Sequence, residues 1–247
     1  MARGAERRSG EIRYGDPRGW YVRLFSVYVR FYLRRHIHGV RLAGDGGPSG
    51  LDGPLVDYLN HPSWWDPLLA MTLRKRICGA RRHVAVIDAE MAERYSVLRP
   101  LGLVGIEKGP VGARRFLEVG RRVLAERDTV IWITPQGRFV DARDRSVPLA
   151  AGLDRLARLA PEAHFLPLAL EYPFWDERTP EALARFGSPV PAADARDPAR
   201  LESALIETQE RLAADAIARA PDRFVELLSG RTGVGGIYDL WRRMRGV

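Results

Sequence analysis

A histidine and an aspartate five positions apart, His61 and Asp66, are the side chains of this sequence best suited to acid–base chemistry. Histidine can accept a hydroxyl proton near neutral pH, and a nearby carboxylate can hold its tautomer and stabilise the imidazolium. This is the base and orienting half of a Ser-His-Asp triad, with the substrate's own hydroxyl in place of the serine. Positions i and i+5 of a straight helix are about 140° apart, so the pair requires His61 to lie outside regular helix.

The same residues also have a purely structural interpretation. Asp66 before Pro67 is a good N-cap with proline at the first helical position, and Asn60 could cap a short turn before Pro62. A His-x4-Asp spacing is also common by chance. The spacing alone therefore does not decide between helix capping and catalysis.

Other catalytic and cofactor motifs are absent from the sequence. It contains no G-x-S-x-G nucleophile elbow and no G-x-x-x-x-G-K-[ST] phosphate loop, and the glycines at 230–236 lack dinucleotide-binding spacing. His36-Ile37-His38 could put two imidazoles on one strand face, but no matching carboxylate or cysteine cluster follows. We therefore expect no metal and no cofactor. The single cysteine cannot form an internal disulfide, which favours a reducing compartment.

Short apolar runs alternate with helical patterns, and these elements must position His61. Strands are predicted at 55–59, 83–88, 101–106, 129–134 and 164–170, and helices at 67–77, 89–98, 112–127 and 150–160. A polar, proline-containing stretch at 173–198 is followed by helical patterns at 199–219 and 221–229. Apolar strands separated by helices predict an α/β fold with a mostly parallel central sheet flanked by helices. His61 would follow a strand directly, where open α/β sheets bind ligands.

The positive charge of the sequence is concentrated at its N-terminal end. Residues 1–41 carry ten arginines against three acidic residues, which gives +7 of the chain's net +8. A nucleic-acid enzyme more often spreads basic charge over its binding face, so we expect no nucleic-acid partner. We assign residues 1–50 to a basic amphipathic segment and connector, and residues 51–247 to the α/β domain.

The segment 19–35 is predicted to be an aromatic helix with one narrow basic stripe. Its polar positions are Arg23, Ser26, Arg30 and Arg34, spaced by three or four residues. Such a helix can lie in the membrane interface with its arginines facing anionic lipid, or it can be buried with its arginines reaching solvent. The charge of this end favours the membrane. The sequence contains no run of about 18 uncharged apolar residues, and its first 19 residues lack the apolar core of a signal peptide.

Four blocks between residues 60 and 170 resemble the PlsC-like lysophosphatidic acid acyltransferases, a family of glycerolipid acyltransferases. Asn60-His61-Pro62-Ser63-Trp64-Trp65-Asp66 matches the NHxSxxD form of the family's HxxxxD motif. The second block, GLVGIEK at 102–108, resembles the family's strand that ends in an acidic and then a basic residue. The third, IWITPQGR at 131–138, stands where the family has a strand followed by FPEGTRS. The fourth, FLPLAL at 165–170, resembles the family's final VPV-type strand.

This resemblance implies an O-acyltransferase with His61 as general base and Asp66 as its orienting partner. The donor would be acyl-CoA or acyl-carrier protein, the acceptor a lipid hydroxyl, and the location the cytoplasmic face of the cell membrane as a peripheral protein. The implied substrate-binding residues are Asn60, Ser63, Lys108, Gln136, Gly137 and Arg138. Lys108 would be a point-charge contact for an acceptor phosphate, although it could also be an ordinary solvated lysine.

The third block departs from the family pattern. Gln136 replaces glutamate and carries no charge, and Arg138-Phe139 replaces Thr-Arg. The acceptor therefore stays open between a lysophospholipid-like lipid and a glycolipid, carotenoid glycoside or other lipid without phosphate. Pro135-Gln136-Gly137 is also explained by a chain-reversing turn. A non-catalytic protein of the same fold that binds membrane surfaces or nucleic acid is the remaining alternative.

Overall fold

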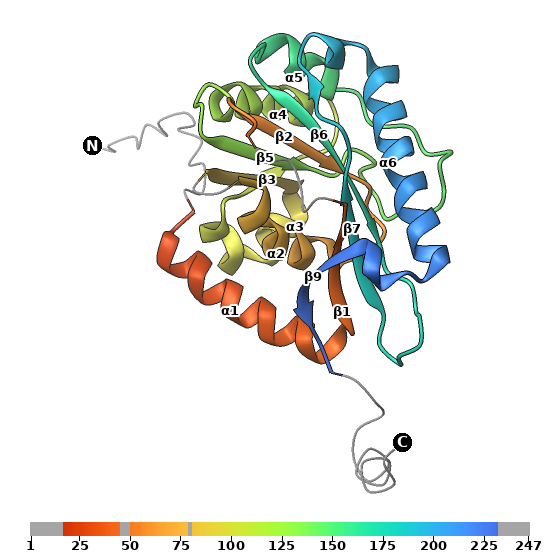
Figure 1. Ribbon diagram of the computed structural model, residues 1–247. Coiled ribbons are helices and arrows are strands. Elements are labelled where there is room, and N and C mark those ends of the chain that lie inside the picture. Colours follow the sequence, from red (N-terminus) through yellow and green to blue (C-terminus); the bar gives the residue numbers. More distant parts are fainter. Residues whose placement is uncertain (1–16, 45–49, 79–80, 232–247) are drawn as a thin grey trace, which may run out of the picture.

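The computed structural model describes residues 17–44, 50–78 and 81–231, which form one mixed sheet with helices on both faces (Figure 1). Nine strands make up the sheet in this part of the chain: β1 (Gly39–Ala43), β2 (Leu55–Leu59), β3 (Arg82–Asp88), β4 (Leu103–Ile106), β5 (Thr129–Ile133), β6 (His164–Glu171), β7 (Glu181–Phe186), β8 (Val190–Pro191) and β9 (Phe224–Ser229).

The strands are arranged in the order β4-β3-β5-β2-β6-β7-β1-β9, and β8 pairs with β6 off this path. Of the pairings between described strands, five are parallel and three are antiparallel. Every residue of β2 and β5 is buried, because helices cover both faces of the central strands. The α/β fold with a mostly parallel sheet, predicted from the sequence, is confirmed.

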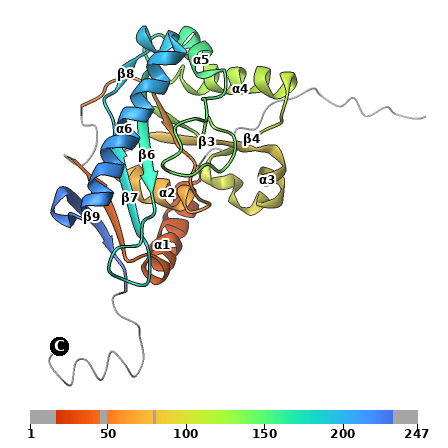
Figure 2. The same ribbon diagram turned by 90° about the vertical axis from the view of Figure 1, so that its right-hand side faces the viewer.

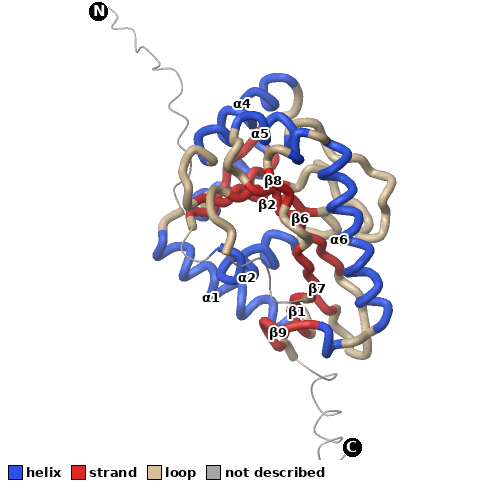
Figure 3. The backbone as a smooth tube through the Cα atoms, turned by 45° about the horizontal axis from the view of Figure 1, so that its top comes forward, coloured by secondary structure: helices blue, strands red, loops and turns tan. Residues whose placement is uncertain are grey.

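Helices of the two faces pack against separate hydrophobic clusters, and Figures 2 and 3 show them on opposite sides of the sheet. Leu33 of α1 (Gly19–His36) and Leu69 of α2 (Asp66–Cys78) share one cluster with Trp132 of β5. The other cluster includes residues from α4 (Pro110–Val123), α5 (Leu153–Leu159) and α6 (Pro198–Ala218). The short elements between these are α3 (Ala89–Arg94), η1 (Ser96–Leu101), η2 (Asp194–Arg196) and η3 (Pro221–Arg223).

The C-terminal third differs from the sequence prediction. The polar stretch at 173–198 contains β7 and β8, and the expected helix at 221–229 is instead η3 followed by β9. The buried residues of β9, Phe224 and Leu228, are four apart, a spacing that also fits a helix. Antiparallel pairing with β1 decides the outcome, and the sequence of the segment itself does not encode that partner.

The N-terminal segment is part of the same folded body. Residues 39–43 fall within the segment 1–50 of the sequence analysis, yet they form β1 and pair with β7 and β9. The boundary expected at residue 50 therefore does not separate them from the sheet. Among the described helices, none combines the length and the apolar character needed to cross a bilayer. Residues 1–16, which hold part of the expected basic charge, and most of 230–236 lie outside the described residues.

Candidate active site

The predicted catalytic pair lies at the edge of the sheet where β2, β5 and β6 end. These three strands are parallel neighbours, so the residues that follow them meet at one edge. His61 comes two residues after β2, in a stretch without regular helix, and Asp66 is the first residue of α2. This break lets the two side chains meet, with 2.6 Å between His61 Nδ1 and Asp66 Oδ2.

Asp66 is held by three donors inside the protein. Its side chain is 2% exposed, whereas that of His61 is 21% exposed. The Tyr172 hydroxyl donates to Oδ1 at 2.7 Å, and the Ser63 N–H donates to Oδ2 at 3.3 Å. Burial raises the pKa of Asp66, and the hydrogen bonds from His61 and Tyr172 oppose this increase. The buried carboxylate can thus fix the Nδ1–H tautomer while the imidazole stays accessible from outside.

Asn60 and Ser63 shape the turn that carries His61. The Asn60 amide is 1% exposed; its Nδ2 donates to Leu170 O at 2.9 Å, and its Oδ1 accepts the Leu170 N–H at 2.8 Å. The Ser63 hydroxyl accepts the Trp65 N–H at 3.3 Å. Asn60 therefore joins the end of β2 to β6, and its position favours a structural role over the substrate contact expected for it. Substrate binding by Ser63 stays a prediction.

The loop after β5 forms hydrogen bonds with both the backbone N–H and the backbone carbonyl of His61. Gln136 Oε1 accepts the His61 N–H at 3.0 Å, and the Val140 N–H donates to His61 O at 3.0 Å. Gly137 has a φ of 64°, which favours glycine, and its N–H donates to Thr134 O across the expected turn. The structure therefore brings Gln136 to the site as part of its scaffold.

The two predicted cations lie in different places. Lys108 follows β4, three strands from β2 and thus roughly 14 Å away along the sheet edge, and its Nζ is 3.9 Å from Asp88 Oδ2. Arg138 is exposed on the loop. The pKa of Asp144 is lowered mainly by hydrogen bonds from Ser146, and the charge of Arg138 adds to this effect.

Two residues of the site were not identified from the sequence. Tyr172 follows β6 directly, so its position after a parallel strand could have indicated it. Phe139, noted only as a departure from a motif, has its ring centroid 4.5 Å from that of His61 and is 59% exposed. Among the described residues, no group of three or more His, Cys, Asp or Glu side chains is placed to hold a metal ion.

Comparisons with protein-family models and with curated proteins give no match. Among solved structures, the chain is similar to the crystal structure of the 1-acyl-sn-glycerophosphate (LPA) acyltransferase, PlsC, from Thermotoga maritima. The TM-score is 0.51, the sequence identity is 15%, and the match covers 79% of each chain. The chain has a PlsC-like fold. At this identity the likeness establishes the architecture, and the chemistry must be argued from the site.

Proposed function

We propose that this protein is an O-acyltransferase that transfers an acyl group from an acyl thioester to a lipid hydroxyl, with His61 as general base. The observation that carries the proposal is the hydrogen bond of 2.6 Å between an accessible imidazole and the buried Asp66 carboxylate. The PlsC-like fold and the order of the four sequence blocks support the same reaction class. The donor is acyl-CoA or acyl-carrier protein, and no cofactor is needed.

The chemical steps follow from the two nitrogens of His61. Asp66 holds the proton on Nδ1, so the lone pair of Nε2 takes the proton of the acceptor hydroxyl as its oxygen attacks the thioester carbon. The tetrahedral intermediate collapses with cleavage of the C–S bond, and the imidazolium returns the proton to the departing thiolate. The products are an ester and a free thiol, and the enzyme ends in its starting protonation state.

The acceptor hydroxyl belongs to a lipid, either lysophospholipid-like or without phosphate. The Thermotoga maritima protein is described as a 1-acyl-sn-glycerophosphate acyltransferase, which supports a lipid acceptor of this general kind. The position of Phe139 beside His61 favours the second candidate, a lipid with an uncharged headgroup.

The exposed face of α1 supports a peripheral location on an anionic membrane, which we assign to the cytoplasmic face of the cell membrane. Val22, Val29 and Leu33 of α1 are buried against the protein. Its opposite face bears apolar side chains that are each more than half exposed: Trp20, Leu24, Val27, Tyr28 and Phe31. Apart from the adjacent Val27 and Tyr28, these positions are spaced by three or four residues, and together they form one stripe beside exposed arginines. We propose no nucleic-acid partner.

The membrane-facing stripe is continuous with the turn that carries the catalytic pair. Tyr32 of α1 has its ring centroid 6.2 Å from that of Trp64, which is 53% exposed and lies between His61 and Asp66 in the sequence. A bilayer against α1 would therefore lie next to the site, and a lipid acceptor could reach His61 without entering water.

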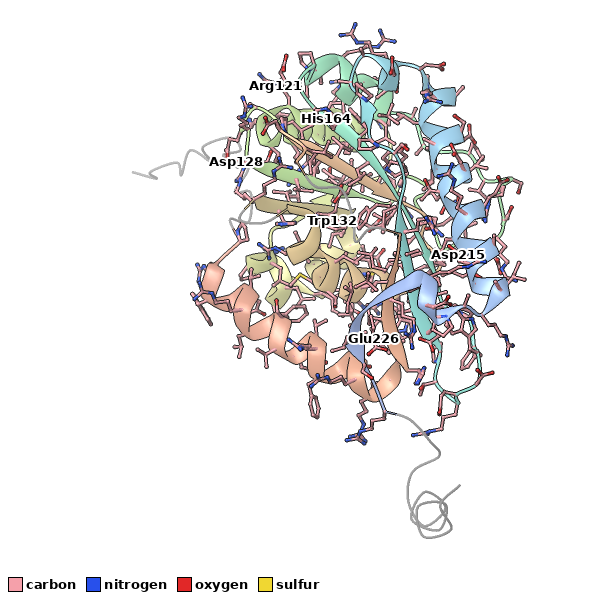
Figure 4. The ribbon with its side chains drawn as sticks, viewed as in Figure 1. Arg121, Asp128, Trp132, His164, Asp215 and Glu226 are labelled. Carbon is pink, nitrogen blue, oxygen red and sulfur yellow. The ribbon has the colours of Figure 1, made fainter. Side chains whose placement is uncertain are left out.

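Replacement of His61 tests the proposed reaction. With labelled acyl-CoA or acyl-carrier protein and a total-lipid extract, we expect His61→Ala to lower acyl transfer by roughly 100- to 10,000-fold, because the general base is lost. His164→Ala is the matched control, since His164 begins β6 at the end of the strand opposite the site (Figure 4). Circular dichroism would verify that both variants fold. Full activity of folded His61→Ala would rule out this mechanism.

A further inference from the structure

An exposed aromatic ring, that of Phe139, lies directly beside the proposed catalytic base His61. Phe139 is 59% exposed, and its ring lies 4.5 Å from the His61 ring between centroids, with 40° between the planes. The loop that carries Phe139 is bonded to the backbone of His61: the Gln136 side-chain Oε1 accepts the His61 N–H, and the Val140 N–H donates to the His61 carbonyl. The position of the ring is therefore set by the same hydrogen bonds that position the base.

Two cations of this region, Arg143 and Lys108, have protein carboxylates as partners. Arg143 donates to Glu171 Oε1 from Nε at 2.9 Å and from Nη2 at 2.6 Å, and Glu171 is buried. The Lys108 Nζ is 3.9 Å from Asp88 Oδ2, three strands away from β2. Arg138 is exposed on the loop that carries Phe139. A phosphate monoester brought to His61 would instead meet a phenyl ring, which offers no hydrogen bond and no compensating charge for its lost hydration.

We propose that the acceptor of this site has an uncharged, hydroxyl-rich headgroup, such as a sugar, which stacks on Phe139 and presents one hydroxyl to His61 Nε2. The electron-rich face of the phenyl ring suits the weakly positive C–H groups of a sugar face. Gln136 uses its carbonyl oxygen for the His61 N–H, and its NH2 group suits a neighbouring hydroxyl of the acceptor.

This inference rests on the proposed acyl transfer, because it takes His61 Nε2 as the base. It names the class of the acceptor, a lipid with a glycosyl headgroup, and assigns to Phe139 the choice between this class and phosphate-bearing acceptors. A charge added at Phe139 should therefore change which acceptor is used, while leaving the proton transfer at His61 available.

The first experiment compares two acceptors with the same acyl chain, 1-acyl-glycerol 3-phosphate and a monoglucosyl monoacylglycerol, in vesicles with a labelled acyl thioester. We expect kcat/KM to be at least about 10-fold higher for the glucosyl lipid. Equal or higher kcat/KM for the phosphate acceptor would overturn the inference. Transfer that depends on His61 and reaches extract lipids but neither probe would overturn it while the proposed function stands. No transfer to any lipid would remove both.

The second experiment places a cation at the ring. We expect Phe139→Arg to shift the kcat/KM ratio toward 1-acyl-glycerol 3-phosphate by about 10- to 100-fold, because a guanidinium can bind phosphate in two hydrogen bonds. Val111→Arg is the matched control; Val111 is 69% exposed in α4, which follows β4 at the same sheet edge. An equal shift in the control, or no shift in Phe139→Arg, would contradict the role of Phe139.

A third variant covers the case in which Phe139→Arg does not fold. Phe139→Leu keeps an apolar side chain but removes the aromatic face, so we expect KM for the glucosyl lipid to rise about 5- to 10-fold with little change in kcat. Phe139→Tyr should retain the wild-type KM. Unchanged KM in Phe139→Leu would rule out stacking of the headgroup on this ring.

Discussion

At the scale of single residues, the proposed acyl transfer requires the charge of Asp66 as well as the imidazole of His61. Burial raises the pKa of Asp66, and the Tyr172 hydroxyl is one of the groups that oppose this effect. The phenol itself stays protonated, because burial and the adjacent Asp66 charge raise the pKa of Tyr172. Tyr172 is thus a constant donor, and we regard it as a positioning residue that keeps the carboxylate ionised and aimed at Nδ1.

Removal of this hydroxyl should change both the rate and its pH dependence. In Tyr172→Phe the pKa of Asp66 rises further, so the carboxylate is lost at a higher pH and the acid limb of kcat/KM moves upward. We expect kcat to fall about 10-fold, the usual effect of losing a hydrogen bond to a charged group. The measurement is a pH–rate profile of acyl transfer.

Tyr58→Phe is the matched control for Tyr172→Phe. The Tyr58 hydroxyl donates to Leu201 O at 3.1 Å in the hydrophobic cluster that includes α6, on the other face of the sheet. Its loss should lower stability but leave the acid limb unchanged. A Tyr172→Phe profile that overlays the wild-type profile would show that the hydrogen bond does not tune the pair.

The sequence indicated the pair itself but not the residues that support it. His61 and Asp66 are five positions apart, so a local motif contains both. Tyr172 and the Leu170 partner of Asn60 are 106 and 110 residues away from the groups they bind. The family resemblance predicts that Asn60 binds substrate, but the sequence does not show that the backbone of β6 occupies its amide.

At the scale of secondary-structure elements, α1 is buried against the protein on one side only. One face is buried against the protein through Val22, Val29 and Leu33, and the other leaves an apolar stripe exposed. The periodicity alone could not show this, because aromatic and aliphatic residues surround most of the helix. Only the position of α2 and β9 beside α1 shows which side is covered.

Substitution of the exposed stripe tests its contact with the membrane. We expect Leu24→Ser, Val27→Ser and Phe31→Ser together to weaken binding to anionic vesicles by at least about 100-fold, because each apolar side chain buried in the interface contributes on the order of 1 kcal/mol or more. Flotation of vesicles at increasing salt is the measurement, and added salt should weaken the wild-type interaction.

Ile217→Ser is the control for the α1 variant, since Ile217 is 66% exposed on α6. This substitution removes an exposed apolar side chain far from α1 in the fold and should leave flotation unchanged. Equal binding by the triple variant and the wild-type protein would show that α1 does not contact the membrane.

The central elements were predictable because each is encoded locally. The strands at 55–59 and 129–134 correspond to β2 and β5 within one residue, since continuous apolar runs bounded by turns identify buried parallel strands. The strands β1, β7, β8 and β9 were missed for the opposite reason. In β7 the buried residues include Glu181, which forms hydrogen bonds with His38 and Arg41. A charged residue at a buried position interrupts the apolar pattern of this strand, and the partners that neutralise it are distant in the sequence.

At the scale of the whole molecule, one buried carboxyl lies in the interior on the face covered by α1 and α2. Asp57 lies on the same face of β2 as Leu55 and Leu59, which pack with Leu69 and Leu73 of α2. It is 0% exposed, and neither of its oxygens has a hydrogen-bond partner among the described residues. Burial raises the pKa of Asp57 well above its usual value, and the charge of Arg81 opposes this only in part.

The stability of the protein should therefore depend on pH through Asp57. Above about pH 4 the unfolded chain releases this proton while the folded protein keeps it, so the folded state binds more protons and the free energy of unfolding falls as pH rises. Asp57→Asn removes this dependence. We expect the variant to gain stability relative to the wild type between pH 4 and pH 8, measured by urea denaturation.

Asp128→Asn is the control for this pH dependence, because Asp128 is exposed in the connection before β5 (Figure 4). Its stability curve should follow the wild-type curve. If the curve of Asp57→Asn also runs parallel to the wild-type curve across this range, the buried carboxyl does not keep its proton in the folded state.

The hydrogen bonds that join the HxxxxD segment to the end of β6 have a consequence during synthesis. A growing chain that has left the ribosome only as far as Gln136 already contains both His61 and Asp66. It still lacks Leu170 to fix Asn60 and Tyr172 to hold the carboxylate. His61 and Asp66 therefore gain these supporting contacts only after more than two thirds of the polypeptide has been made, so we expect incomplete chains to lack the arrangement that the proposed acyl transfer requires.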